Sequence, residues 1–213
     1  MNERQRLGSA FSALLTASFI TNLGDGMRLA ALPLLATTLT SSPLLITSVT
    51  AAQFLPWATF APFGGVIVDR SDRRRLIMIS QAWRALIMAL LGVAVLADTT
   101  SIWLLMLVAF MITVGEILVD PSVVATVPAL VAPADLDLAN SRITTVEVVT
   151  NEFVGAPVGA AAFAWAPWLP FLLDAISYLG SIVPFSQVRS PSVQIDAPAP
   201  RRSVRAEMGV GLR

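Results

Sequence analysis

The feature that most limits how this chain can fold is a series of long apolar stretches separated by short polar connections. A helix needs about 20 mostly apolar residues to cross a hydrocarbon core about 30 Å thick. Because lipid offers the backbone no hydrogen-bond partners, each such stretch must be helical. We therefore predict an all-α membrane protein whose residues 1–188 form a bundle of six transmembrane helices: 11–39, 44–68, 76–97, 102 to about 125, about 143 to 165, and 169–188.

The composition favours the same class of protein and excludes several others. Hydrophobic residues make up 55% of the chain and charged residues 13%, whereas soluble domains carry about a quarter charged residues. The chain has neither Cys nor His, which removes thiol chemistry and the usual zinc and haem ligands. The net charge is zero, so no overall field favours nucleic acid. We expect no cofactor, no metal, no nucleic-acid partner and no enzymatic activity.

The positions of the arginines predict the orientation in the membrane. All 14 basic residues are Arg, and basic residues accumulate in the cytoplasmic connections of membrane proteins. The connections 40–43, 98–101 and 166–168 contain none. We therefore predict a multi-pass protein of the cell membrane with both termini in the cytoplasm, because all arginines outside the apolar stretches fall on the side of the termini: Arg4, Arg6, Arg70, Arg73, Arg74, Arg75, Arg142, Arg189, Arg201, Arg202, Arg205 and Arg213.

The connection between the second and third stretches carries a recognisable motif. Residues 65–77 read G-V-I-V-D-R-S-D-R-R-R-L-I, which resembles the signature loop of the major facilitator superfamily, G-x-L-a-D-r-x-G-r-r-x-x-l, at the same place in the chain. Asp72 stands where the general motif has Gly, a departure familiar in the exporter branch that includes the enterobactin exporter. The matching positions are Gly65, Asp69, Arg70, Arg73 and Arg74.

The resemblance implies that the chain is the N-terminal six-helix half of a secondary transporter and that this loop gates it. In the family, the Asp of the motif, here Asp69, faces a helix N-terminus of the other half. The motif's second Arg pairs with an acid at the inner end of span four, and Asp120 lies at that depth. The alternative is that the arginines of 70–75 serve only to orient the protein in the membrane.

Charged residues also lie inside the apolar stretches, where charge is costly and indicates either function or a buried partner. Counting from the helix ends places Arg84, Glu116 and Glu147 at a similar depth on the cytoplasmic side. An isolated carboxylate there would be protonated, whereas a neighbouring Arg would keep it ionised. Two interpretations stay open: a carboxyl that switches between these states to couple proton movement, and a static Arg84–Glu116 pair that joins two helices.

A second charged set lies in the outer half of the first stretch. Asp25 and Arg28 are three residues apart and therefore share one helix face, with Asp174 of the sixth stretch at a similar depth. The resemblance implies that the first span lines the central cavity, which makes Asp25 the first candidate for an acid that couples protons or contacts substrate. A structural role in hydrogen bonding is the alternative. Glu152, near the midplane, faces either the cavity or a helix seam.

Residues 155–160, G-A-P-V-G-A, show a weak resemblance to the G-P-x-x-G motif of antiporters, with the Pro displaced by one position. Small residues let helices approach closely, and Pro permits a bend. The segment therefore predicts either a moving helix interface or ordinary tight packing.

These features together predict a proton-coupled exporter of a small molecule that works by alternating access and is present here as its N-terminal half. The alternative is a truncated or regulatory half-transporter with no transport activity of its own. The expected partners are a small-molecule substrate, the lipid bilayer, and a missing C-terminal half or a second copy. Residues 189–213, rich in Pro and Arg, are interpreted as a flexible cytoplasmic linker to that half or as a basic segment on anionic lipid headgroups.

Overall fold

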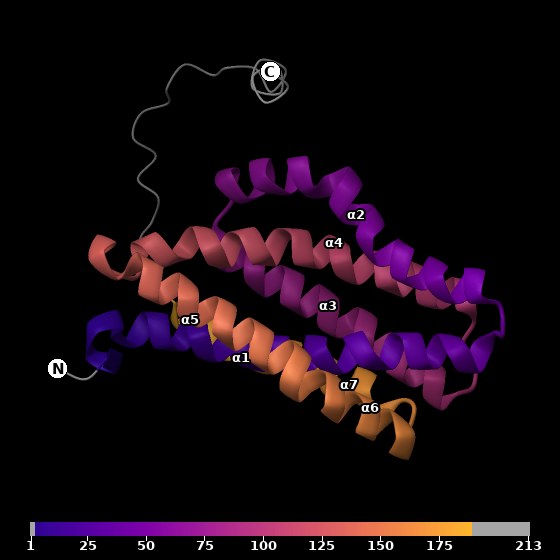
Figure 1. The fold of residues 1–213 in the computed structure, drawn as a ribbon. Coiled ribbons are helices and arrows are strands. Elements are labelled where there is room, and N and C mark those ends of the chain that lie inside the picture. The colour runs from indigo at the N-terminus through magenta and orange to yellow at the C-terminus, as the bar shows by residue number, and fades with distance from the viewer. Residues whose placement is uncertain (1–2, 189–213) are drawn as a thin grey trace.

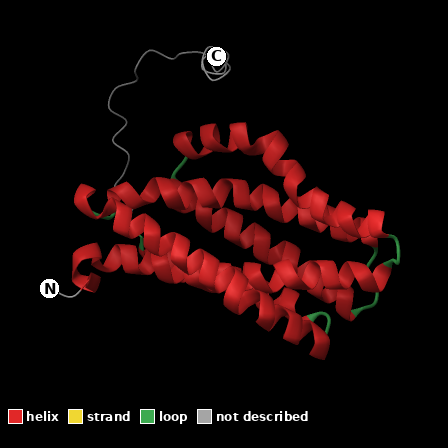
Figure 2. Cartoon of the chain, in the orientation of Figure 1, coloured by secondary structure: helices red, strands yellow, loops and turns green. Residues whose placement is uncertain are grey.

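The computed structural model describes residues 3–188, apart from the side chains of 3–6, 61–63, 69 and 70. The linker predicted for 189–213 lies outside the described residues. Within the described part the chain is helical throughout, with short loops and no strand, as Figure 2 shows. The predicted all-α fold class is confirmed.

Each predicted apolar stretch forms a helix at its predicted place (Figure 1). Two short 3₁₀ turns, η1 (Val127–Ala129) and η2 (Pro133–Asp135), follow the fourth helix. The fifth stretch is a continuous rod in which a π-helical segment joins two α-helices. The remaining elements are α1 (Glu3–Leu39), α2 (Pro43–Arg70), α3 (Arg73–Leu96), α4 (Ile102–Thr126), the rod of α5 (Leu136–Val148), η3 (Val149–Gly155) and α6 (Ala156–Trp165), and α7 (Leu169–Gln187).

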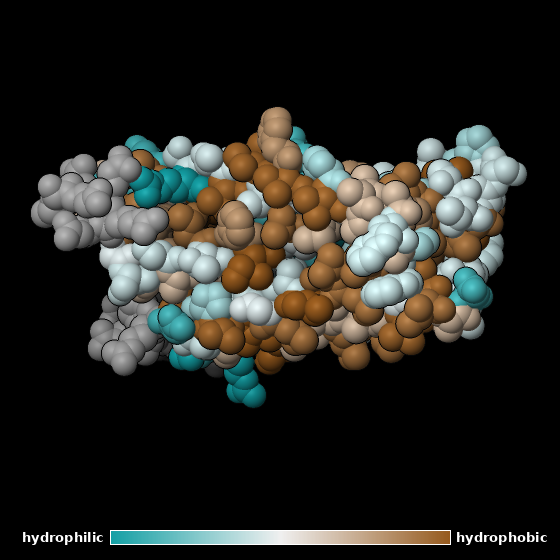
Figure 3. Space-filling view, turned by 90° about the horizontal axis from the view of Figure 1, so that it is seen from below, coloured by the Kyte–Doolittle hydropathy of each residue, from teal (hydrophilic) through white to brown (hydrophobic). Residues whose placement is uncertain are grey.

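Four segments of the described chain are long and apolar enough to cross a membrane by length and composition: Leu7–Leu39, Arg73–Leu96, Ile102–Ala129 and Leu169–Gln187. Spans formed by α2 and by the rod from α5 to α6 would complete the predicted six, and this number stays a prediction. On the face shown in Figure 3, hydrophobic side chains predominate over the middle and hydrophilic ones gather toward the two ends. That distribution suits a bundle whose middle lies in hydrocarbon.

The helices pack so that α7 lies against both α1 and α3. Helix α4 lies against α2 and α3 (Figure 1). The rod from α5 to α6 packs along α1. In contrast, α1 and α4 make only limited contact with each other. The consequence is a space between α1, α4 and α5 that side chains only partly fill.

Glycines allow α1 and the rod to approach closely. A Cβ atom at Gly26 would overlap the backbone of Asn151, and one at Gly159 would overlap the backbone of Met27. A Cβ atom at Gly155 would crowd the carbonyl oxygen of Leu23 at 2.7 Å. The small residues of 155–160 therefore serve tight packing against α1, one of the two predicted roles.

Two buried apolar clusters occupy the two ends of the bundle. One includes Leu32, Leu91 and Phe171, and the other includes Phe11 and Phe185. Between them lies a layer in which polar and charged side chains are buried, namely Thr21, Arg28, Gln81, Arg84, Asp174 and Ser181. Burying such groups is favourable only when they bond to one another, so this layer is where a site is to be sought.

Candidate functional site

Asp25 of α1 is the centre of the polar layer. Its Oδ1 accepts hydrogen bonds from Arg28 Nη2 at 3.3 Å and from Arg84 Nη2 at 2.7 Å. The hydroxyl of Tyr178 donates to the same oxygen at 2.5 Å. One carboxylate oxygen thus joins α1, α3 and α7.

Glu116 of α4 is the second acid of the network. Its Oε1 accepts from Arg28 Nη2 at 2.5 Å and from Arg84 Nη2 at 3.2 Å. Each guanidinium therefore bridges both carboxylates, so two positive charges face two negative ones. The side chains of Arg28 and Arg84 are only 6% and 1% exposed. Such charges are tolerable in an apolar bundle because each is paired.

Uncharged groups hold Arg84 in place. Its Nη1 donates to Gln81 Oε1 at 3.2 Å, and its guanidinium carbon lies 4.2 Å from the centre of the Tyr178 ring, a cation–π arrangement. The amide nitrogen of Gln81 in turn donates to Thr21 Oγ1 at 2.7 Å and to Ser181 Oγ at 2.8 Å. This chain of bonds links α3 to α1 and α7.

Asp174 of α7 is a third acid, fully buried beside the network. Its Oδ2 lies 3.6 Å from Arg28 Nε, and neither atom has a hydrogen-bond partner. Its Oδ1 receives only a long bond from Ser177 Oγ at 3.4 Å. Gly24 provides the room, since a Cβ atom there would overlap the side chains of Asp174 and Ser177.

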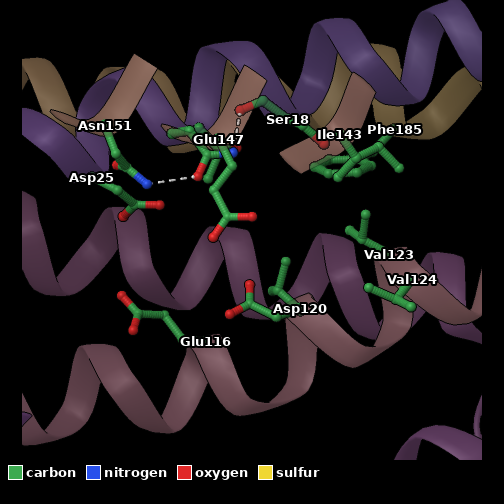
Figure 4. A pocket seen from close by; sticks show the side chains of 13 residues that line it. Ser18, Asp25, Glu116, Asp120, Val123, Val124, Ile143, Glu147, Asn151 and Phe185 are labelled. Carbon is green, nitrogen blue, oxygen red and sulfur yellow. Dashed lines mark hydrogen bonds between the residues drawn. The ribbon is translucent and has the colours of Figure 1, made fainter. Parts of the chain in front are cut away.

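A cavity of about 240 Å³ opens next to the network between α1, α4, α5, η3 and the end of α7. Figure 4 shows the carboxylates of Asp25, Glu116, Asp120 and Glu147 around one shared space. Apolar side chains, among them Val123, Val124, Ile143 and Phe185, line the other end of the cavity (Figure 4). The cavity therefore has an acidic part and an apolar part.

The structure joins the two charged sets that counting along the sequence had kept apart. Asp25 and Arg28 meet Arg84 and Glu116 in one network, and the predicted Arg84–Glu116 ion pair is present. Glu147 instead lines the cavity without contacting Arg84. Depth counted along a single helix does not fix how that helix sits against its neighbours, so the count placed the two sets at different depths.

Glu152 and two uncharged residues complete the comparison with the predicted site. Glu152 is exposed and does not line the cavity. Sequence reasoning missed Tyr178 and Gln81 as members of the network. A signal was present, because Tyr178 is the chain's single Tyr and both residues place a polar group inside an apolar stretch, where it needs a partner.

The predicted gating loop lies where α2 ends and α3 begins. Asp72 is the N-cap of α3 and accepts from the backbone nitrogen of Arg75 at 3.2 Å, which explains an acid where the general motif has Gly. Arg73 Nη1 donates to the carbonyl oxygen of Ala125 at 2.9 Å. Arg73 thus reaches α4 as predicted, but its partner is a backbone carbonyl rather than Asp120, whose carboxylate lies at the cavity (Figure 4).

The other residues of the motif differ in their surroundings. Gly65 faces open space, where an added Cβ atom would meet nothing within 4 Å. Arg74 lines a small apolar pocket, and its buried Nε has no hydrogen-bond partner. The side chains of Asp69 and Arg70 lie outside the described residues.

Helices with an apolar exterior, a buried ion network and a half-apolar cavity define a polytopic membrane protein with an internal polar site. Residues 7–213 match the model of the family described as transmembrane secretion effectors, and the chain belongs to this family of the major facilitator superfamily. The resemblance noted for the signature loop is thereby confirmed. The narrower likeness to the enterobactin-exporter branch stays a prediction.

Two curated relatives share the name macrolide efflux protein A. The one from Streptococcus pyogenes is 25% identical over 144 residues, which cover 68% of this chain and 35% of the relative. The one from Enterococcus faecalis is 25% identical over 139 residues, which cover 65% of this chain and 42% of the relative. The chain thus matches less than half the length of these relatives.

Proposed function

We propose that the bundle is the N-terminal half of a proton-coupled exporter of small molecules that works by alternating access. The observation that carries the proposal is the cavity, because it places four carboxylates beside two buried arginines inside an apolar bundle. Ionisable groups at this depth in a membrane bundle mark substrate or ion pathways by default. Membership in a secretion family and two relatives named for efflux support export.

The substrate we propose is an amphiphile that carries a positive charge. Arg28 and Arg84 neutralise Asp25 and Glu116, whereas within the described part of the chain no ion pair joins Asp120 or Glu147 to a basic side chain. An organic cation would supply the missing positive charge, and its apolar portion would contact Val123 and the other apolar residues at the far end. A cavity of about 240 Å³ holds a charged group and a short apolar segment.

The rest of the binding site is proposed to come from a second bundle, either further along a longer chain or in a second copy. Alternating access requires two bundles that rock around one site. The large apolar side chains exposed on α2 suit such a neighbour as well as lipid: Leu44, Phe54, Leu55, Trp57 and Phe60. In the proposed orientation both termini are cytoplasmic, and the apolar end of the cavity lies toward that side.

The signature loop is proposed to act as a latch between conformations. The hydrogen bond from Arg73 to Ala125 supports this role, because it ties the loop to α4, the helix that carries Glu116 and Asp120. A movement of α4 around the substrate would then displace the loop through this hydrogen bond. Asp69 would complete the latch by facing the second bundle.

The test is transport of a fluorescent organic cation, ethidium, by the protein reconstituted in liposomes under an imposed proton gradient. We expect gradient-dependent accumulation that Glu147→Gln reduces at least about tenfold, since tenfold corresponds to about 1.4 kcal/mol, a modest value for a lost charge contact in a desolvated site. Glu152→Gln is the matched control, because Glu152 is exposed and lies off the cavity.

Equal losses in Glu147→Gln and Glu152→Gln would reject the cavity as the binding site. If ethidium accumulated equally with and without the proton gradient, proton coupling would be rejected. If the complete protein bound ethidium and moved none of it, the alternative of a regulatory half-transporter would replace the exporter.

A further inference from the structure

We propose that Asp174 carries the proton that is exchanged for the substrate, and that Arg28 links this proton site to the cavity. In this arrangement Asp174 is protonated while Arg28 binds Glu116 and Asp25. When a cationic substrate binds Glu116 in place of Arg28, Arg28 forms a hydrogen bond with Asp174, and Asp174 releases its proton. The inference rests on the proposed antiport function, and it names a different acid from Asp25, the first candidate from the sequence.

The charge count of the network supports a neutral Asp174. Two guanidiniums face three carboxylates, since Arg28 Nε also lies 3.6 Å from Asp174 Oδ2. With all three acids ionised, the network would therefore carry one unbalanced buried negative charge, which costs several kcal/mol. Among the described side chains, Arg28 and Arg84 are the cations that lie near Asp174. The surrounding ionisable groups are Asp25 and Arg28 from α1, Arg84 from α3, Tyr178 from α7 itself and, through Arg28, Glu116 from α4, while α6 has none.

Hydrogen bonding separates Asp174 from Asp25. Oδ1 of Asp25 receives three donors, two of them cationic, and such bonds favour the charged form of a carboxyl. A carboxylate held in this way is poorly suited to take up and release a proton. Asp174 has an Oδ2 without any donor, in a side chain that is 0% exposed. Of the three acids, Asp174 has the fewest bonds to its charged form.

Arg28 already lies close to Asp174, its proposed partner after proton release. Its Nε and the Oδ2 of Asp174 are 3.6 Å apart, and both atoms are buried without a partner. A charge-assisted N–H···O bond has a length of about 2.7–2.9 Å, so a shift of less than about 1 Å would form it. In the structure, Nη2 of the same side chain donates to Glu116 Oε1 at 2.5 Å. Once the cation has replaced Arg28 at Glu116, a small movement of Arg28 is therefore enough to bond its Nε to Asp174.

The exchange balances in charge and atoms. A monovalent organic cation enters among the carboxylates of the cavity, beside Asp120 and Glu147, and replaces Arg28 as the partner of Glu116, which is 20% exposed there. The O–H bond of Asp174 breaks, its electron pair stays on the carboxylate, and the proton is released to the solution. Arg28 neutralises the new carboxylate. One positive charge enters the network and one leaves, so the buried layer keeps its net charge.

The experiment measures protons released when tetraphenylphosphonium binds to the detergent-solubilised protein in weakly buffered solution with a pH-sensitive dye. This cation has a fixed charge and no proton to lose, so any released proton comes from the protein. We expect about one proton per bound cation for the wild type and for Glu152→Gln, by linkage of the two binding events. Asp174→Asn should bind the cation and release none, and Asp174→Glu should restore release.

Undiminished release by Asp174→Asn would overturn the assignment and leave the exporter proposal standing. Failure of the wild type to bind tetraphenylphosphonium would instead count against the proposed substrate class. Infrared spectroscopy tests the protonation of Asp174 in either case and does not require Asp174→Asn. A protonated-carboxyl C=O band should be present in the free protein and should shift in Ser177→Ala, because Ser177 Oγ lies 3.4 Å from Asp174 Oδ1. If this band were absent, or if Ser177→Ala left its frequency unchanged, Asp174 would not be protonated in the free protein.

Discussion

Replacing Arg84 with Met should destabilise the bundle strongly, because it removes a charge while roughly preserving the side chain's bulk. Arg84 is 1% exposed and bonds to Asp25 at 2.7 Å and to Glu116 at 3.2 Å. Loss of one partner of a buried ion pair costs about 3 to 5 kcal/mol. The lost cation–π contact with Tyr178 adds up to about 2 kcal/mol, although contributions at one site are not additive.

Thermal unfolding of the detergent-solubilised protein measures this effect. For a domain of this size, 1 kcal/mol corresponds to a change in Tm of about 2–4 °C, so we expect a decrease of about 6–20 °C. The matched control is Arg75→Met, because Arg75 lies on the same helix and is exposed. It should change Tm by no more than about 2 °C.

A double substitution separates charge balance from packing. Asp25→Asn combined with Arg84→Met removes one negative and one positive charge, and it should recover at least about half of the lost stability, as expected for coupled neighbours. If Arg84→Met and Arg75→Met had the same Tm, the network would contribute nothing to stability. If the double variant were less stable than both single variants, the charge argument would be wrong.

Three further outcomes test the orientation, the latch and the helix contact. Single cysteines at Ser41 and Ser71, in a chain without native Cys, should react with impermeant reagents from opposite sides of the membrane, and labelling from one side would reject the topology. Arg73→Ala should reduce transport severely with normal membrane insertion, because it loses the bond to α4, whereas Arg75→Ala should not; equal activity would leave only an orienting role. Gly159→Val should lower Tm by several degrees through overlap with the backbone of α1, and an unchanged Tm would reject that contact.

The helices were predictable because the demands of a bilayer act on each segment separately. An apolar run of sufficient length must be helical whatever its neighbours are, so the predicted stretches agree with the observed helices to within a few residues at most ends. The differences occur where polar residues extend a helix. For example, α3 begins at Arg73 rather than at residue 76, because Asp72 caps it and arginines continue a helix outside the apolar region.

The rod from α5 to α6 shows what local patterns do not contain. Nothing in the residues of η3 distinguishes a π-helical segment from an α-helix, and this segment was not predicted. It lies where Gly155 packs beside Leu23 and where Gly26 meets the backbone of Asn151. Its place in the structure is thus one of close contact with another helix, which sequence spacing within a single helix does not describe.

The sequence by itself determined that this is a helical membrane protein, which of its charges lie at costly depths, and to which superfamily its loop points. Only the tertiary structure decided how those charges combine. Arg28 and Arg84 share Asp25 and Glu116, and Asp174 has only a 3.6 Å contact with Arg28, although all five residues were visible as charges in apolar stretches. The physical reason is that pairing depends on differences of about 1 Å between side chains on different helices, because a charge-assisted hydrogen bond forms only within a narrow range of distances. Such distances are set by helix tilt and packing, which no spacing along a single helix records.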